Sequence, residues 1–264
     1  MKIAIVGKGG SGKTTLAATL SRLLARRGFP VLAIDDDPNP NLGMALGVAG
    51  SELAAQHSLP RSILVERADA SGETQIVGLA EPIEAISTEH GIAAPDGVTL
   101  LMNVQIEHGG GGCLCGEHIT VRDMLGYMIE PEDQFTILDM EASVEHMGRG
   151  TPRYADVLLM ITEPYYRSLE TTGRLAPLAR DLEVKQMYVV ANKVRGSRDE
   201  EAIHRYCDER GLEVLAVLPF DEEVVEAESS GTPILDADPL SAYVRVVEQL
   251  LDRLVTAPLA MPLS

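Results

Sequence analysis

The chain has 264 residues and is 45% hydrophobic, which suffices for one large α/β domain over 1–264 with a substantial buried core. Its net charge of −18 comes from 40 acidic and 22 basic residues, and a surface of this sign repels phosphate backbones, so we expect no nucleic-acid partner. The chain has only three cysteines and no apolar run near the roughly 18 residues of a membrane span, and the first predicted strand leaves no room for a signal peptide. These features predict a cytoplasmic protein.

The first predicted element is the apolar strand Ile3–Val6, and a helix from about Thr14 to Arg27, ending at Gly28, follows a glycine-rich loop. The loop fits the phosphate-binding pattern G-x-x-x-x-G-K-[ST]. Lys13 would reach the β- and γ-phosphates of ATP, and the Thr14 hydroxyl would bind Mg²⁺. The predicted nucleotide-binding residues here are Gly7, Lys8, Gly9, Gly10, Ser11, Gly12, Lys13, Thr14 and Thr15.

The same loop also satisfies a second motif, the G-x-G-x-x-G fingerprint of dinucleotide-binding domains. Asp35 lies about where the ribose-binding acid of such a domain belongs. An NAD site has no need of an ammonium and a hydroxyl at Lys13 and Thr14, whereas a triphosphate with Mg²⁺ needs both. The pair therefore favours ATP.

Lys8 is not required by the general pattern. With it, the string Gly-Lys-Gly-Gly-Ser-Gly-Lys-Thr-Thr resembles the deviant Walker A loop of the nitrogenase-iron-protein, MinD and ParA family. The resemblance implies a homodimer in which Lys8 crosses the interface to the partner's nucleotide, so Lys8 joins Lys13 as an expected catalytic residue.

Acidic residues follow two segments that we expect to be strands, Val31–Ile34 and Phe135–Leu138. Ligands of open α/β sheets gather at the carboxyl ends of the strands. Asp139 would hold Mg²⁺ through water, as a Walker B aspartate does, and Asp35 could do the same. Asp37 could orient the attacking water as the third catalytic residue. The alternative is that these acids only cap the next helix.

The segment from Asn39 to Asp96 has no clear period, and we expect short helices and an edge strand there. Val98–Val104 is predicted to be a buried strand. After the glycine-rich loop that follows, Thr120 is expected to cap a helix through about Ile129, with Asp123 at its third position.

Cys113 and Cys115 form a Cys-x-Cys pair behind four glycines. One chain supplies two thiolates, whereas a closed zinc site or a cluster needs four, which a symmetric dimer would provide. Nickel or copper could accept a planar arrangement. Two free thiols are the alternative, and His108 and His118 are possible further ligands. Cys207, on a predicted helix among charged residues, is expected to be inert.

The remaining strands are expected at 157–161, 186–190 and 214–218, separated by helices over about 165–182 and 198–210 and followed by one over 239–254. Alternating strands and helices predict a doubly wound, mostly parallel α/β sheet. Asn192 and Lys193 end one strand, and the side-chain amide of Asn192 could form hydrogen bonds with the edge of a nucleobase. The next strand ends in four residues that could cover the base, Leu218, Pro219, Phe220 and Asp221.

The segment Leu138–Thr151 resembles the second switch of the CO-dehydrogenase nickel-insertion ATPases, the CooC type, which combine this phosphate loop with a metal-binding Cys-x-Cys pair at a homodimer interface. Ser11 and Ser143 depart from that pattern where an aliphatic residue and a glycine are expected.

This resemblance implies an ATP- and Mg²⁺-dependent ATPase that carries Ni²⁺, or Zn²⁺, on Cys113 and Cys115 to a CO-dehydrogenase-like client. One alternative is a reductase like the nitrogenase iron protein, with an iron–sulfur cluster on the same thiolates. Another is a positioning ATPase of the MinD or ParA kind, which the acidic charge and the proline-containing C-terminus oppose.

Overall fold

The computed structural model describes residues 1–37, 39–55, 58–69, 73–103, 115–131, 133–141, 147 and 150–256, with the backbone alone at 115–119. Its central sheet has eight strands in the order β10-β9-β8-β1-β7-β2-β6-β5. All neighbours pair in parallel except β5 and β6. The strands are β1 (Lys2–Gly7), β2 (Val31–Asp36), β5 (Ile92–Ala93), β6 (Thr99–Met102), β7 (Phe135–Met140), β8 (Val157–Thr162), β9 (Gln186–Val194) and β10 (Val214–Pro219).

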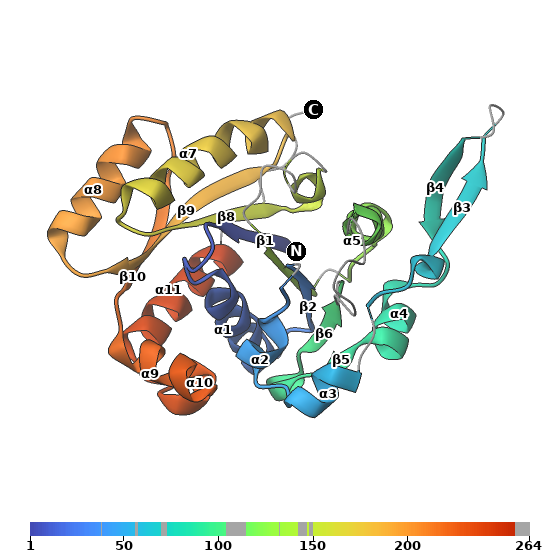
Figure 1. The fold of residues 1–264 in the computed structure, drawn as a ribbon, viewed down its shortest axis with the longest axis horizontal. Coiled ribbons are helices and arrows are strands. Elements are labelled where there is room, and N and C mark those ends of the chain that lie inside the picture. Colours follow the sequence, from blue (N-terminus) through green and yellow to red (C-terminus); the bar gives the residue numbers. More distant parts are fainter. Residues whose placement is uncertain are drawn as a thin grey trace.

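Helices cover both faces of this sheet (Figure 1). On one face lie α1 (Lys13–Arg26) and α11 (Ala242–Thr256), and on the other α5 (Cys115–Tyr127), α7 (Tyr166–Asp181) and α8 (Ser197–Asp208). Successive strand residues serve opposite faces: Ile137 belongs to the core under α1, and Leu138 to the core under α5. Burial on both sides explains why the parallel strands are continuous apolar runs.

The predicted doubly wound sheet is confirmed, with its seven expected strands and five expected helices. The segment after β2 also contains the expected short helices and edge strand: α2 (Leu42–Leu46), α3 (Gly50–Ala55), α4 (Ile83–His90) and β5. Short 3-10 turns lie at η1 (Arg61–Ile63), η2 (Pro95–Gly97) and η3 (Thr151–Tyr154). The antiparallel hairpin of β3 (Leu64–Ala68) and β4 (Thr74–Leu79), which projects from the body in Figure 1, was not expected.

Two predicted helix starts were wrong. Thr120 lies inside α5 and does not cap it, and the helix ends at Tyr127. Thr120 is 2% exposed beside the buried Val121 and Met124, so packing against the sheet outweighs its capping tendency. The last helix begins at Ala242, because the Ser241 hydroxyl accepts a hydrogen bond from the Val244 N–H and so acts as the cap.

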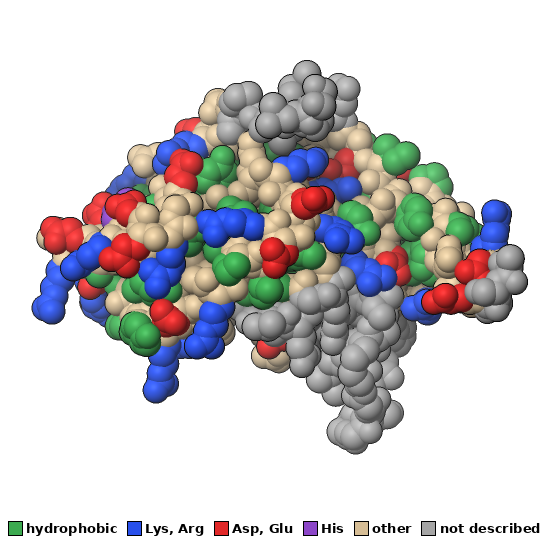
Figure 2. All heavy atoms as spheres, turned by 90° about the horizontal axis from the view of Figure 1, so that it is seen from above, with side chains coloured by type: hydrophobic (Ala, Val, Ile, Leu, Met, Phe, Trp, Pro, Cys, Tyr) green, Lys and Arg blue, Asp and Glu red, His purple; other side chains and the backbone are tan. Residues whose placement is uncertain are grey.

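Acidic and basic side chains are interspersed over the face of the molecule shown in Figure 2. Hydrophobic side chains on this face gather toward the end that carries the β3–β4 hairpin. Among the helices in the described ranges, none combines the length and apolarity that crossing a membrane requires.

Candidate nucleotide site

The phosphate loop connects β1 to α1 at the carboxyl edge of the sheet. Its first glycine packs against β8, since a Cβ on Gly7 would lie 2.5 Å from the carbonyl oxygen of Ile161. Gly12 has a φ of +94°, and a Cβ there would lie 2.3 Å from Nδ2 of Asn192. Both glycines are therefore required by sterics. α1 begins at Lys13, so the positive end of its dipole faces the loop.

The end of β9 fastens this loop. The Asn192 amide donates from Nδ2 to the Ser11 carbonyl over 2.7 Å, and its Oδ1 accepts from the Lys193 N–H over 2.9 Å. Lys193 Nζ donates to the Gly10 carbonyl over 2.5 Å and pairs with Glu163 at 3.0 Å. The sequence predicted that Asn192 and Lys193 contact the nucleotide; the structure places them against the phosphate loop, where they hold its backbone.

A candidate magnesium site, called the magnesium corner below, lies beside the loop. The Thr14 hydroxyl donates to Oδ2 of Asp139 over 2.6 Å. Asp139 is fully buried, and its Oδ1 has no hydrogen-bond partner among the residues that the structure describes. Asp35, also fully buried, is its neighbour in register across β2 and β7. A hydroxyl, an unpartnered carboxylate oxygen and a second carboxylate fit a hydrated Mg²⁺.

Burial sets the protonation of these acids. It raises the pKa of Asp139 to about 6, against the lowering effects of the Thr14 hydrogen bond and the Lys13 charge. Burial, and then the charge of Asp139, raises the pKa of Asp35 well above its usual range. The charge of Asp37 raises the pKa of both, so Asp37 lies close to this corner. The neighbouring carboxyl groups of Asp35 and Asp139, with the charge of Asp37 acting on both, favour a bound cation.

Asp37 lies directly beyond β2 and is held by its backbone and side chain. Its N–H donates to Asp35 Oδ1 over 3.3 Å, and its own Oδ1 accepts from the Asn39 N–H over 2.9 Å.

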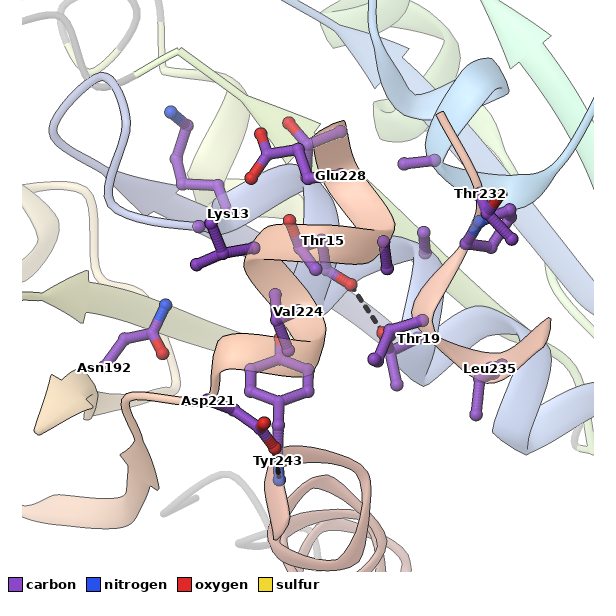
Figure 3. Close-up of a pocket in the computed structure, with 18 of the residues that line it drawn as sticks. Lys13, Thr15, Thr19, Asn192, Asp221, Val224, Glu228, Thr232, Leu235 and Tyr243 are labelled. Carbon is purple, nitrogen blue, oxygen red and sulfur yellow. Dashed lines mark hydrogen bonds between the residues drawn. The ribbon is translucent and has the colours of Figure 1, made fainter. Parts of the chain in front are cut away.

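Lys13 is 6% exposed and points toward the curve of the loop (Figure 3). The structure thus brings together Lys13, Thr14, Asp35, Asp37 and Asp139, as the sequence predicted; Lys8, half-buried, lies in the loop itself.

A cavity of about 560 Å³ opens beside the loop (Figure 3). One wall is the loop and α1, and the other is made by α9 (Glu222–Ser230), α10 (Ile234–Ala237) and Tyr243 of α11. Pro219 and Phe220 line it as predicted, and the Arg195 guanidinium stacks on the Phe220 ring at 3.5 Å. Leu218 does not line it, because this side chain is fully buried in the core.

Asp221 lines the cavity with Pro219 and Phe220, but sequence reasoning missed α9 itself, which brings Val224 and Glu228 to the cavity. The sequence does contain a pattern that marks the start of α9. Asp221 precedes two glutamates, a typical helix start, and its Oδ1 accepts from the Glu223 N–H over 3.1 Å. Its Oδ2 accepts from the Tyr243 N–H over 3.0 Å, which ties α9 to α11.

The predicted ligands of the transported metal lie outside the side chains that the structure describes. Cys113, His108 and Ser143 lie outside the described residues, and Cys115 and His118 are described in backbone alone, within α5. In the described ranges no cluster of three or more His, Cys, Asp or Glu side chains could hold a metal ion. Cys207 is buried, and burial raises the pKa of its thiol to about 11, which is consistent with the expectation of an unreactive cysteine.

Comparison with known proteins gives concordant matches. A family model described as the CobQ/CobB/MinD/ParA nucleotide binding domain matches residues 2–234. The chain is 41% identical, over 89% of its length and 91% of the relative, to an uncharacterized ATP-binding protein of Methanocaldococcus jannaschii. It is 36% identical, over 90% of its length and 91% of the relative, to the carbon monoxide dehydrogenase accessory protein CooC of Rhodospirillum rubrum. The cell division ATPase MinD of Pyrococcus furiosus shares the fold, with a TM-score of 0.72 at 23% identity over 96% of this chain and 98% of that one.

Proposed function

The chain belongs to the CobQ/CobB/MinD/ParA nucleotide-binding family and is a P-loop ATPase, and we propose that it is a dimeric metallochaperone for a CO-dehydrogenase-like enzyme. The observation that carries this proposal is the 36% identity, over 90% of the chain, to a carbon monoxide dehydrogenase accessory protein. The Cys113–Cys115 pair supplies the thiolates that such a function needs. Ni²⁺ is the proposed cargo, with Zn²⁺ as the alternative occupant.

The geometry supports ATP hydrolysis at the phosphate loop. The loop amides and Lys13 bind the phosphates, while Thr14 and Asp139 hold the hydrated Mg²⁺. A Mg²⁺ ion held by Thr14 and Asp139 would supply positive charge beside the phosphates, where negative charge develops during hydrolysis. Asp37 orients the attacking water from the edge of the same corner, and Lys8 completes the site of the partner subunit. Pro219, Phe220 and the α9 wall enclose the rest of the nucleotide.

The cargo site belongs to the dimer and to neither chain alone. Each chain offers two thiolates, and a closed thiolate site for Zn²⁺ needs four. Closure around ATP would bring two Cys-x-Cys pairs together, and hydrolysis would separate them. This arrangement makes metal affinity depend on the nucleotide state, which is what a carrier needs in order to load and release.

Metal titration tests this proposal. Ni²⁺ or Zn²⁺ added to the metal-free protein, followed by light scattering and elemental analysis, should give one metal per two chains and promote dimers. Cys113→Ser and Cys115→Ser should abolish this binding, while Cys207→Ser, the matched control at a buried thiol, should leave it unchanged. A metal held tightly by a monomer, or by the Cys113 variant, would refute the shared site. A brown protein with visible absorbance would instead identify an iron–sulfur carrier.

A further inference from the structure

A contact between a cation and an aromatic ring lies where β9 and β10 end, at the rim of the cavity. β9 ends at Val194 and β10 at Pro219, and these two residues are opposite each other in the parallel register. Arg195 and Phe220 come next in the two chains. The Cζ atom of the Arg195 guanidinium lies 3.5 Å from the centre of the Phe220 ring, so the guanidinium covers one face of that ring.

Backbone hydrogen bonds hold both residues in place. The Phe220 N–H donates to the Val194 carbonyl over 2.9 Å, and the Arg195 N–H donates to Oδ2 of Asp199 in α8 over 3.0 Å. The Arg195 side chain is exposed, and with the residues that the structure describes its guanidinium forms neither an ion pair nor a hydrogen bond. The ring is therefore the contact that orients this guanidinium.

The ring belongs to the same cavity as the phosphate loop. Phe220 lines this cavity together with the loop, whereas Arg195 does not, so the guanidinium lies against the ring from outside the cavity. The other two phenylalanines of the chain, Phe29 and Phe135, pack edge to face at the opposite edge of the sheet, with ring centres 5.0 Å apart. A nucleotide whose phosphates lie on the loop thus finds the flat surface of Phe220 in the remainder of its cavity.

Asn192, from which hydrogen bonds to the base were predicted, has its amide engaged elsewhere. Its Nδ2 donates to the Ser11 carbonyl, and its Oδ1 accepts from the Lys193 N–H. At this end of the cavity a base therefore depends on stacking more than on hydrogen bonds. Every nucleobase has two flat faces, and an aromatic side chain is a strong stacking partner for them.

From these contacts we infer that Arg195 is a positioning residue for the adenine base of ATP, because it holds the Phe220 ring as the platform on which the base stacks. A ring that is fixed before the base arrives loses less conformational freedom on binding, and this strengthens the complex. Arg195 itself touches neither the base nor the phosphates. The inference depends on nucleotide binding at the phosphate loop and is independent of the proposed metal cargo.

Calorimetry with Mg²⁺ and either ADP or inorganic pyrophosphate separates the base from the phosphates. Pyrophosphate has no base, so its affinity should not depend on the platform, whereas that of ADP should. Phe220→Leu removes the flat ring but keeps an apolar side chain, and it should raise the dissociation constant for ADP about 10-fold. Arg195→Ala leaves the ring unsupported and should raise the same constant about 3-fold. Both variants should bind pyrophosphate with the parental affinity.

A double variant and a matched control test whether Arg195 acts through the ring. Arg195→Ala combined with Phe220→Leu should bind ADP no more weakly than Phe220→Leu alone, because the guanidinium then has no ring to hold. Arg210→Ala is the control. Its guanidinium covers the Tyr206 ring at 3.6 Å in the same manner, and neither residue lines the cavity, so both affinities should stay at the parental value.

The outcomes separate this inference from the nucleotide site itself. Equal losses of ADP and pyrophosphate in Arg195→Ala would make the pair a support of the phosphate loop and overturn its role at the base. Parental ADP affinity in Arg195→Ala, or a further loss in the double variant, would overturn it as well. A parent that binds pyrophosphate as tightly as ADP would refute the platform while the loop stands, and a parent that binds neither would refute the nucleotide site. Should Phe220→Leu fail to fold, the exposed Arg195→Ala decides the question.

Discussion

Asp139 is a fully buried carboxyl group whose pKa is raised to about 6. An unfolded chain has the ordinary value near 3.9, so between these values the folded state binds more protons. The contribution of the protonated Asp139 carboxyl group to the free energy of unfolding is therefore complete below about pH 4 and is lost as pH rises through 6. A shift of this size corresponds to about 3 kcal/mol. The raised pKa of Asp35 acts in the same direction.

We therefore expect the nucleotide-free and Mg²⁺-free protein to lose unfolding free energy between about pH 4 and 6.5. Asp139→Asn should flatten much of this slope and stabilise the protein at pH 7.5, although it removes an Mg²⁺ ligand and slows hydrolysis. Urea unfolding of parent and variant at several pH values measures the difference. Parallel stability curves for the two proteins would contradict the assignment of the slope to Asp139.

Lys13→Ala tests the phosphate loop at its central charge. The ammonium faces the terminal phosphates, and no other side chain of α1 supplies that charge there, so we expect ATP binding to fall below detection in calorimetry. The fold should remain, because Lys13 makes no contribution to either core. ATP binding at the parental affinity would remove the loop from the proposed site.

At the scale of elements, β9 holds the phosphate loop through Asn192. Asn192→Ala removes the buried hydrogen bond to the Ser11 carbonyl of the loop and the acceptor of the half-buried Lys193 N–H of β9. Losses of this kind cost about 1–3 kcal/mol, so the dissociation constant for ATP should rise about 10-fold or more. The affinity for inorganic pyrophosphate should fall by a similar factor, because the loop binds the phosphate groups.

The opposite result would be informative. If Asn192→Ala weakens ATP but leaves pyrophosphate unchanged, then Asn192 acts on the base, as its sequence position first indicated, and the loop is held by its other contacts. Gly12→Ala provides a companion variant. The alanine Cβ would lie 2.3 Å from the Asn192 amide, at a backbone φ of +94°. The Gly12→Ala variant should therefore bind neither ATP nor pyrophosphate.

The elements differ in how far the sequence determines them. The long apolar strands and the glycine spacing of the loop act locally, so the sheet, the loop and the strand-end acids were predictable. The contact of Asn192 with Ser11 joins positions 181 residues apart and depends on the finished sheet. Thr120 has a capping side chain, but its burial decides its conformation. α9 was missed although Asp221 marked its start, because a nine-residue helix carries little hydrophobic periodicity.

At the scale of the whole molecule, Lys8 tests the dimer. It lies half-buried in the loop, and the family role places it against the partner subunit's nucleotide. We expect Lys8→Ala to bind ATP with nearly parental affinity, while ATP-driven dimerisation and hydrolysis are lost. Light scattering with a non-hydrolysable ATP analogue, beside phosphate release, measures both. If the variant still dimerises and hydrolyses ATP, then Lys8 does not act on the nucleotide of the partner subunit.

The position of β1 has a consequence for synthesis of the protein. β1 is made first, yet it pairs with β7 and β8, with Ile3 opposite Ile137 and Val157. At 5–20 residues per second, the ribosome needs roughly 10 s or more to supply these partners. An apolar segment of the nascent chain waits unpaired for this time, which exposes it to aggregation and makes it a target for chaperones that bind emerging chains. The phosphate loop cannot acquire its shape before then, so this protein cannot begin to bind ATP until β7 and β8 have been translated.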